Sequence, residues 1–154
     1  LVVSPIVDSV ACGSQYKTVH FSRRSTAQDS MMSGYVGKPS AMDFNATGML
    51  LATGGGEDVT VWNFQGTGPE GTEPVFLEYH EQPITTLAFA CSGTNLASGS
   101  RDGEVAVWAF KNEKEGTGIG VSQVADAISQ LYWRPDDRAL AAFDSNGGVT
   151  VWSI

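Results

Sequence analysis

The stretch Leu77–Trp108, LEYHEQPITTLAFACSGTNLASGSRDGEVAVW, decides how the chain folds. Asp102-Gly103 stands between two apolar runs, Asn95–Ser100 and Glu104–Trp108. An Asp-Gly pair in this position predicts a hairpin turn of type I′, in which both central residues have positive φ. The two runs are therefore expected to be neighbouring antiparallel strands. Ile84–Phe89 is expected to be a third strand of the same sheet.

The same unit recurs along the chain at a nearly constant period. Trp62, Trp108 and Trp152 are spaced by 46 and then 44 residues, and a valine precedes each of them. His20 follows a valine a further 42 residues before Trp62. Repeats of about 40 to 50 residues with several strands each are typical of propellers and repeat arrays. We therefore predict four approximate repeats, which cover residues 1–34, 35–79, 80–122 and 123–154.

The polar residues of the third repeat resemble the structural tetrad of WD-repeat β-propellers. In that family a histidine before the first strand, a serine or threonine on the second, an aspartate in the tight turn and a tryptophan on the third are linked. The third repeat has all four: His80, Ser98, Asp102 and Trp108. The second repeat keeps Thr53 and Trp62 but has Gly34 near the place of the histidine, and the fourth keeps Trp152. The resemblance implies an all-β propeller fragment of about four blades, each a four-stranded antiparallel sheet.

The two ends of the chain bear on how much of a ring is expected. Alignment of Val3-Ser4-Pro5 with Trp133-Arg134-Pro135 places Leu1 inside a first strand, so the first blade is expected to be truncated. Ile154 comes just after the third strand of the last repeat, so that blade is expected to lack its outer strand. WD-repeat rings commonly take this strand from the N-terminal segment of the same chain. The resemblance thus implies the C-terminal half of a ring of about seven blades.

The histidine, serine and aspartate of the third repeat could also form a hydrolase triad. Such catalysis needs an exposed serine oxygen beside the imidazole and an oxyanion site nearby. The resemblance implies instead a buried chain of hydrogen bonds, in which the aspartate accepts from the imidazole and the serine links the imidazole to the indole N–H. We therefore predict no catalytic residue and no enzyme. The alternative is a propeller enzyme or a metal-homeostasis accessory protein whose active or ligand groups lie in the missing half.

Charge and loop residues indicate a binding protein. The formal net charge is −8, and the adjacent pair Arg23-Arg24 is better explained as a solvated strand end than as a nucleic-acid site. Four residues flank the tetrad turn at the end where the family usually binds proteins: Tyr79, Glu81, Gln82 and Arg101. We predict a scaffold for a protein or peptide partner. The N-terminal half of the same propeller, or another copy of the chain, is expected to close the ring.

Other kinds of site are not expected. Cys12 and Cys91 have no paired spacing and His20 and His80 lie on separate repeats, so neither a disulfide nor a metal site is predicted. No apolar stretch is long enough to span a membrane, and no cofactor is implied. The absence of a secretory sequence favours the cytoplasm or an organelle interior.

Two glycine-rich stretches could form phosphate or dinucleotide sites. Gly54-Gly55-Gly56 is followed by no helix, so it is expected to form a hairpin turn. Gly116–Gly120 lacks the spacing of a dinucleotide fingerprint and has no helical pattern after it, so the stretch Lys111–Gly120 is expected to be a flexible loop. A narrower resemblance, from Lys38 to Pro74, is to bacterial and algal WD-repeat proteins whose genes can accompany zinc-chaperone GTPases. It implies metal homeostasis as a context, although no residue of this chain has the spacing of a zinc site.

Overall fold

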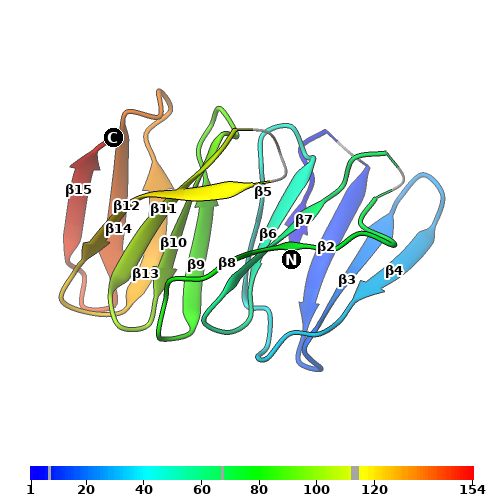
Figure 1. Ribbon diagram of the computed structural model, residues 1–154, viewed down its shortest axis with the longest axis horizontal. Helices are drawn as coiled ribbons and strands as arrows, with labels where there is room; N and C mark the ends of the chain where they lie inside the picture. The colour runs from blue at the N-terminus through cyan, green and yellow to red at the C-terminus, as the bar shows by residue number, and fades with distance from the viewer. Residues whose placement is uncertain (7, 67, 112–114) are drawn as a thin grey trace.

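The computed structural model of the protein describes residues 1–6, 8–66, 68–111 and 115–154. These residues form four antiparallel sheets and no helix (Figure 1). The all-β fold predicted from the sequence is confirmed. Among the described residues, nothing helical has the length and apolarity needed to cross a bilayer.

Each sheet is a meander in which strands adjacent in the chain are also paired. The first sheet contains β1 (Val2–Val3), β2 (Ser9–Ser14), β3 (Thr18–Arg23) and β4 (Gln28–Met32). The second contains β5 (Ala41–Phe44), β6 (Leu50–Gly54), β7 (Val59–Asn63) and β8 (Val75–Leu77). The third contains β9 (Ile84–Phe89), β10 (Asn95–Ser100), β11 (Glu104–Phe110) and β12 (Gly116–Gln123). The fourth contains β13 (Ile128–Trp133), β14 (Ala139–Asp144) and β15 (Val149–Ser153). The exact repeat boundaries given above stay a prediction.

The four sheets stand in one row, face against face, from β4 at one end to β15 at the other (Figure 1). Their first strands line one side of the row, where β1 contacts β5, β5 contacts β9, and β9 contacts β13. Side chains also join neighbouring sheets. Asp43 accepts a hydrogen bond from the amide of Phe89 at 2.7 Å, and the indole of Trp133 donates to the carbonyl of Ala88 at 2.9 Å.

The hydrophobic core lies in three layers between the sheets. Phe21 of the first sheet and Phe64, which follows β7 of the second sheet, meet edge to face, with ring centroids 5.2 Å apart. Strand β6 is buried along its whole length because its sheet has a neighbour on both sides. Such strands read as continuous apolar or small residues rather than as an alternation. The sequence Leu50–Gly54 has this pattern.

The turn between β10 and β11 differs from the predicted type I′ turn. The amide of Gly103 donates to the carbonyl of Ser100 at 3.3 Å, so the central residues are Arg101 and Asp102. Of the residues in this turn only Gly103 has a positive φ, of 88°. Asp102 therefore keeps an ordinary conformation, and the left-handed one falls on the glycine, which tolerates it without steric cost. The prediction of a hairpin was right, and the turn type was wrong.

The stretch predicted as a flexible loop after Lys111 is partly a strand. Residues 112–114 lie outside the described residues, but Gly116–Gln123 forms β12 and pairs with β11 along its length. Six of these eight residues are exposed, since β12 is the outer strand of its sheet. The glycines of this segment favoured the prediction of a loop. The segment is a strand because it pairs with β11, and not because of its own strand propensity.

Candidate functional site

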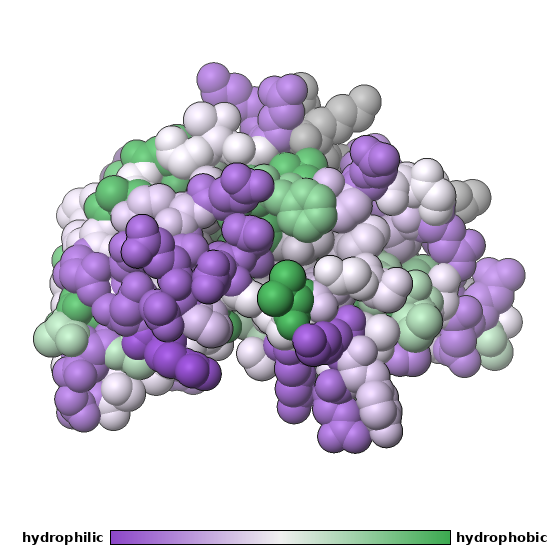
Figure 2. All heavy atoms as spheres, turned by 60° about the horizontal axis from the view of Figure 1, so that its bottom comes forward, coloured by the Kyte–Doolittle hydropathy of each residue, from purple (hydrophilic) through white to green (hydrophobic). Residues whose placement is uncertain are grey.

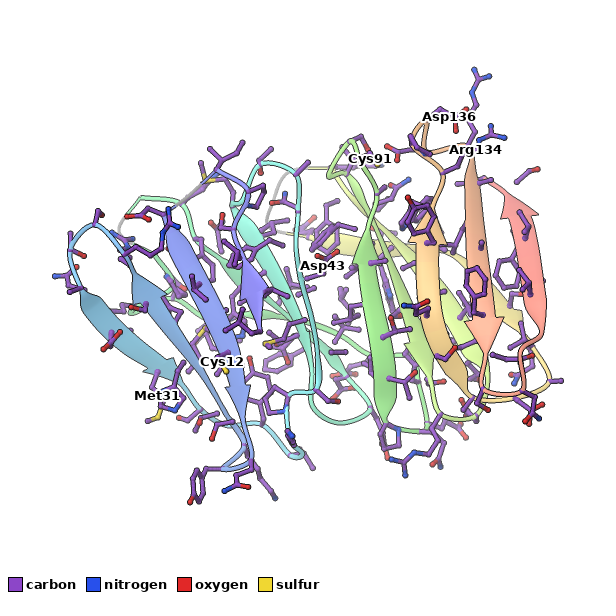
Figure 3. All side chains as sticks on the ribbon, turned by 180° about the vertical axis from the view of Figure 1, so that it is seen from behind. Cys12, Met31, Asp43, Cys91, Arg134 and Asp136 are labelled. Carbon is purple, nitrogen blue, oxygen red and sulfur yellow. The ribbon has the colours of Figure 1, made fainter. Side chains whose placement is uncertain are left out.

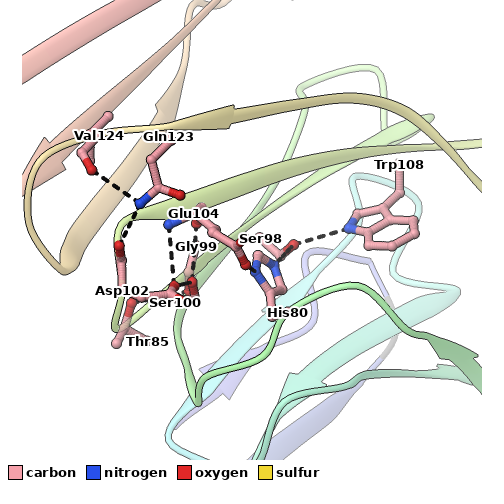
Figure 4. A network of polar contacts seen from close by, with 10 residues as sticks. All are labelled: His80, Thr85, Ser98, Gly99, Ser100, Asp102, Glu104, Trp108, Gln123 and Val124. Carbon is pink, nitrogen blue, oxygen red and sulfur yellow. Dashed lines mark hydrogen bonds and ion pairs between the residues drawn. The ribbon is translucent and has the colours of Figure 1, made fainter.

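Three of the four predicted tetrad residues meet in a buried network. His80 precedes β9, Ser98 lies on β10, and Trp108 lies on β11. The hydroxyl of Ser98 lies 2.7 Å from Nε2 of His80 and accepts a hydrogen bond of 3.0 Å from the indole N–H of Trp108 (Figure 4). The residues are all buried, so these hydrogen bonds form away from water. They tie the segment before β9 to the two central strands of the sheet.

Asp102 does not join this network as predicted. Its carboxylate accepts hydrogen bonds from the Ser100 hydroxyl and, at 3.4 Å, from the Glu104 amide (Figure 4). Nδ1 of His80 has no hydrogen-bond partner, and the nearest carboxylate oxygen is Oε2 of Glu104 at 3.6 Å. The predicted bond from the imidazole to Asp102 is therefore wrong. The donors of its own turn lie closer to the aspartate and hold its carboxylate there.

The arrangement rules Ser98 out as a nucleophile in this state. Its side chain is fully buried, and its oxygen is already engaged by the indole N–H. Nucleophilic catalysis needs that oxygen to be exposed to a substrate beside an imidazole base. The network therefore serves packing and hydrogen bonding, because the segment before β9 and strand β11 each contribute one partner to the same buried oxygen on β10.

His80 stays neutral at ordinary pH. Burial lowers the pKa of its imidazole from 6.5 to about 4, although the charge of Asp102 acts in the opposite direction. Burial has this effect because the protonated form loses its hydration. The neutral ring has one N–H and one acceptor nitrogen, which suits a hydroxyl partner at Nε2.

Stability should therefore fall as pH is lowered from 6.5 towards 4. In that range the unfolded chain binds a proton at His80 and the folded chain does not, so the free energy of unfolding decreases by up to about 3 kcal/mol. Urea unfolding at a series of pH values measures the slope. His80→Gln is the reference, since it keeps every carboxylate and removes the imidazole. An identical pH slope in both proteins would contradict the assignment.

The second sheet has a different residue in the place of the histidine. The hydroxyl of Tyr35 accepts a hydrogen bond of 2.7 Å from the indole of Trp62 and lies 2.8 Å from the hydroxyl of Thr53. The threonine also donates to the carbonyl of Thr60 at 3.1 Å. From the sequence, Gly34 is the residue expected near this position, and Tyr35 was not predicted. Tyr35 directly follows Gly34 in the sequence and could have indicated this contact. A tyrosine, however, matches no position of the tetrad pattern.

Removal of this hydroxyl should weaken the second sheet. Tyr35→Phe leaves the indole N–H of Trp62 without an acceptor in a mostly buried position, which should cost about 1–3 kcal/mol. Thermal and urea unfolding of the variant test this. Tyr16→Phe is the matched control because Tyr16 is 78% exposed and its loss should leave stability unchanged. Equal stability of the two variants would contradict the role of Tyr35.

The four residues predicted to bind a partner lie together near the tetrad. All four side chains are exposed: Tyr79, Glu81, Gln82 and Arg101. They belong to the segment before β9 and to the turn between β10 and β11. Figure 2 shows this end of the molecule, which is mainly hydrophilic over the third and fourth sheets. Cys91, Arg134 and Asp136 lie at the opposite end of the sheets (Figure 3).

Two other features bear on possible chemistry. Cys12 and Cys91 are free and exposed, and they lie on different sheets (Figure 3). Within the ranges that the structure describes, no three or more His, Cys, Asp or Glu side chains are grouped so that they could hold a metal ion. An apolar groove of about 320 Å³ lies between the third and fourth sheets. Its walls come from β11, β12, β14 and β15 and include Ile119, Val121 and Trp152.

Comparison with known proteins agrees with this architecture. Residues 71–109 match the family described as "WD domain, G-beta repeat". The chain is 28% identical over 117 residues to "Periodic tryptophan protein 2 homolog" of Neurospora crassa, which is 75% of this chain and 12% of that protein. It is 26% identical over 121 residues to "Chromatin assembly factor 1 subunit FAS2 homolog" of Oryza sativa subsp. japonica, 72% of this chain and 24% of that protein. It is 31% identical over 109 residues to "Protein transport protein SEC13 homolog A" of Arabidopsis thaliana, 66% of this chain and 36% of that protein.

These matches confirm the resemblance to WD-repeat proteins and, with the four stacked sheets, the fold of a WD-repeat propeller fragment. The chain spans between 12% and 36% of the lengths of these three relatives. The full length of β9, β10 and most of β11 falls inside the family match. The likeness to proteins found beside zinc-chaperone GTPases stays a prediction.

Proposed function

We propose that this WD-repeat chain is a non-catalytic scaffold that binds a protein or peptide. The observation that supports it most is the contrast within the third sheet. The tetrad residues His80, Ser98 and Trp108 are buried and hydrogen-bonded to one another, whereas the neighbouring side chains are exposed: Tyr79, Glu81, Gln82 and Arg101. Exposed aromatic and charged residues grouped on a rigid support are typical of a binding surface. The names of the relatives, which include a chromatin assembly subunit and a protein transport protein, agree with a role in assemblies.

Capture of binding proteins by immobilised chain tests the proposal. The double variant Glu81→Ala and Gln82→Ala should lose partners without loss of stability, because neither side chain is needed for the buried network. Arg138→Ala is the control, since this exposed residue lies in the turn between β13 and β14 at the opposite end of the sheet. Partners retained by the double variant and lost by Arg138→Ala would move the site to the other end.

The partner expected to complete the propeller is a separate part of the proposal. We infer that the N-terminal half of the same propeller, or another copy of this chain, covers the fourth sheet. The apolar groove beside β15 and the unpaired edge of that strand support this inference. An added strand would cover the groove and form backbone hydrogen bonds with the edge. Nucleic acid is not among the proposed partners, since a net charge of −8 repels phosphates. We place the protein in the cytoplasm or an organelle interior.

A further inference from the structure

A pocket of about 180 Å³ opens on the face of the second sheet that is turned towards the first sheet. Thr60 and Trp62 share this face because they are two positions apart on β7, and Phe76 of β8 is paired with Thr60. Trp62 also packs in the same core layer as Phe21 of the first sheet. Residues 33–35, in the connection from β4 to β5, and Pro74, which precedes β8, complete the lining.

The walls of this pocket are mostly rings, and the pocket is open to solvent. Tyr35, Trp62 and Phe76 line it with aromatic side chains, and Pro74 adds a pyrrolidine ring. Phe76 is 59% exposed, so a partner can reach the pocket without a change in the fold. Aromatic rings that face water in a hollow offer a large apolar contact at a low cost in side-chain entropy, and they are enriched where proteins bind other proteins.

The hydroxyl of Thr60 lacks a partner at the wall of this pocket. Thr60 is only 7% exposed, and its side chain belongs to the lining. Its backbone carbonyl accepts a hydrogen bond from the hydroxyl of Thr53, but its own hydroxyl makes no hydrogen bond to any residue that the structure describes. A nearly enclosed hydroxyl is normally hydrogen-bonded, so this one favours a ligand that brings an acceptor or a donor to the pocket.

The phenol and the indole of the pocket wall already have partners. The hydroxyl of Tyr35 accepts a hydrogen bond from the indole of Trp62 at 2.7 Å and lies 2.8 Å from the hydroxyl of Thr53. Since Thr53 donates its proton to the carbonyl of Thr60, the phenol donates its own proton to Thr53. A ligand therefore meets ring surfaces on the walls and, on β7, the hydroxyl of Thr60.

The size and the chemistry of the pocket select a proline. Pockets that hold drug-sized molecules usually exceed about 300 Å³, so this one has the size for a single side chain. A segment in the polyproline II conformation presents its rings to aromatic grooves, and its carbonyls are free to accept because it has no internal hydrogen bonds. Other residues would also bring a backbone N–H, for which the ring walls have no acceptor, whereas proline has none.

We propose that this pocket binds a proline of a partner protein, in a segment with the polyproline II conformation. The proline ring lies among the rings of Tyr35, Trp62 and Phe76. A carbonyl of the same segment accepts a hydrogen bond from the hydroxyl of Thr60. The pocket belongs to the second sheet, whereas the residues of the proposed scaffold surface belong to the third, so this site is a further contact beyond the proposed function.

Two peptides that differ only in their prolines test the proposal. The peptide acetyl-GSAPPPPASG-amide and its counterpart with alanine in place of every proline are titrated into the full chain, and backbone amide shifts are followed by NMR. The proline peptide should shift the amides of residues 33–35, 60–62, 75 and 76, because these residues line or adjoin the pocket. The alanine peptide should leave them in place.

Two substitutions locate the site. Thr60→Val keeps the shape of the side chain and removes the hydroxyl, so it should weaken binding of the proline peptide about three- to tenfold. This variant should be at least as stable as the parent, because the hydroxyl has no partner among the described residues. Phe76→Ala removes an exposed ring from the wall and should weaken binding by at least about tenfold. Tyr16→Ala is the matched control and should bind like the parent, since Tyr16 is an exposed aromatic residue in the turn between β2 and β3.

Three results would overturn the proposal: equal shifts with the alanine peptide, undiminished binding by the doubly substituted Thr60→Val and Phe76→Ala chain, or no proline-dependent shift at millimolar peptide. Tighter binding of acetyl-GSAAYYAASG-amide would also overturn it, because the pocket would then be a site for an aromatic side chain. The scaffold function is separable from these outcomes, since its test uses residues of the third sheet and capture of partner proteins.

Discussion

Ser98→Ala should lower the free energy of unfolding by about 2–5 kcal/mol, because one substitution leaves two buried groups unpaired. The Ser98 oxygen is the single point at which His80 and Trp108 meet, at 2.7 and 3.0 Å. Alanine removes that oxygen and creates little empty space, so the loss comes from hydrogen bonding rather than packing. Urea unfolding followed by tryptophan fluorescence measures the change.

Ser98→Thr is the matched control for this prediction. Thr53 lies on β6 of the second sheet, the strand that corresponds to β10, and there its hydroxyl reaches the Trp62 network through Tyr35. A threonine in the third sheet keeps the hydroxyl and should retain most of the stability. Ser98→Ala within about 0.5 kcal/mol of the parent would contradict the role of the hydrogen bonds, since changes of that size are typical of surface positions.

Asp102→Ala should cost less than Ser98→Ala. The carboxylate of Asp102 is bonded to donors of its own exposed turn, and its removal also relieves repulsion with Glu104. Had the aspartate bonded to the imidazole as the sequence predicted, its loss would have left His80 without an acceptor. The order of the two effects therefore distinguishes the two arrangements of the tetrad.

The strands of the third sheet could be predicted because their pattern and their turns agree. Asn95–Ser100 and Ile84–Phe89 were predicted with the bounds that β10 and β9 have in the structure. A strand that is buried on both faces requires apolar or small residues, and a short turn requires glycine. Both features can be recognised in a short stretch of sequence. The geometry inside the turn was less readable, because an Asp-Gly pair also suits a turn in which only the glycine has positive φ.

The misses come from interactions that a linear pattern does not contain. Gly116–Gln123 forms a strand because β11 offers its edge, and glycine-rich sequence alone favours a loop. Tyr35 stands in the place of a histidine because its hydroxyl contacts that of Thr53, as His80 contacts that of Ser98. Unlike the histidine, it also accepts the hydrogen bond of the indole. The candidate binding residues were predicted from their position beside the turn. The contact between Glu104 and the buried His80 appears only in three dimensions.

The isolated chain should associate through its fourth sheet rather than remain a monomer. This sheet has a neighbour on one face only, and its other face exposes Tyr132, Phe143, Val149 and Val151. The outer face of the first sheet is less apolar, since it presents His20 and Cys12. A face of about 400 Å² is worth about 10 kcal/mol of burial at roughly 25 cal/mol per Å². Only part of this remains after the entropy lost on association, but the edge of β15 adds backbone hydrogen bonds.

Sedimentation velocity of the purified chain at micromolar concentrations measures the association. Val149→Lys combined with Val151→Lys should shift the chain towards monomer by at least about tenfold in the dissociation constant, because lysines on a bare face and edge repel a second sheet. Val36→Lys is the control, since this valine is 83% exposed and lies before the second sheet. A parent chain that sediments as a monomer, or association that survives the double variant, would show that the fourth sheet needs no cover. Either result would also contradict the proposal that a second polypeptide completes the propeller at β15.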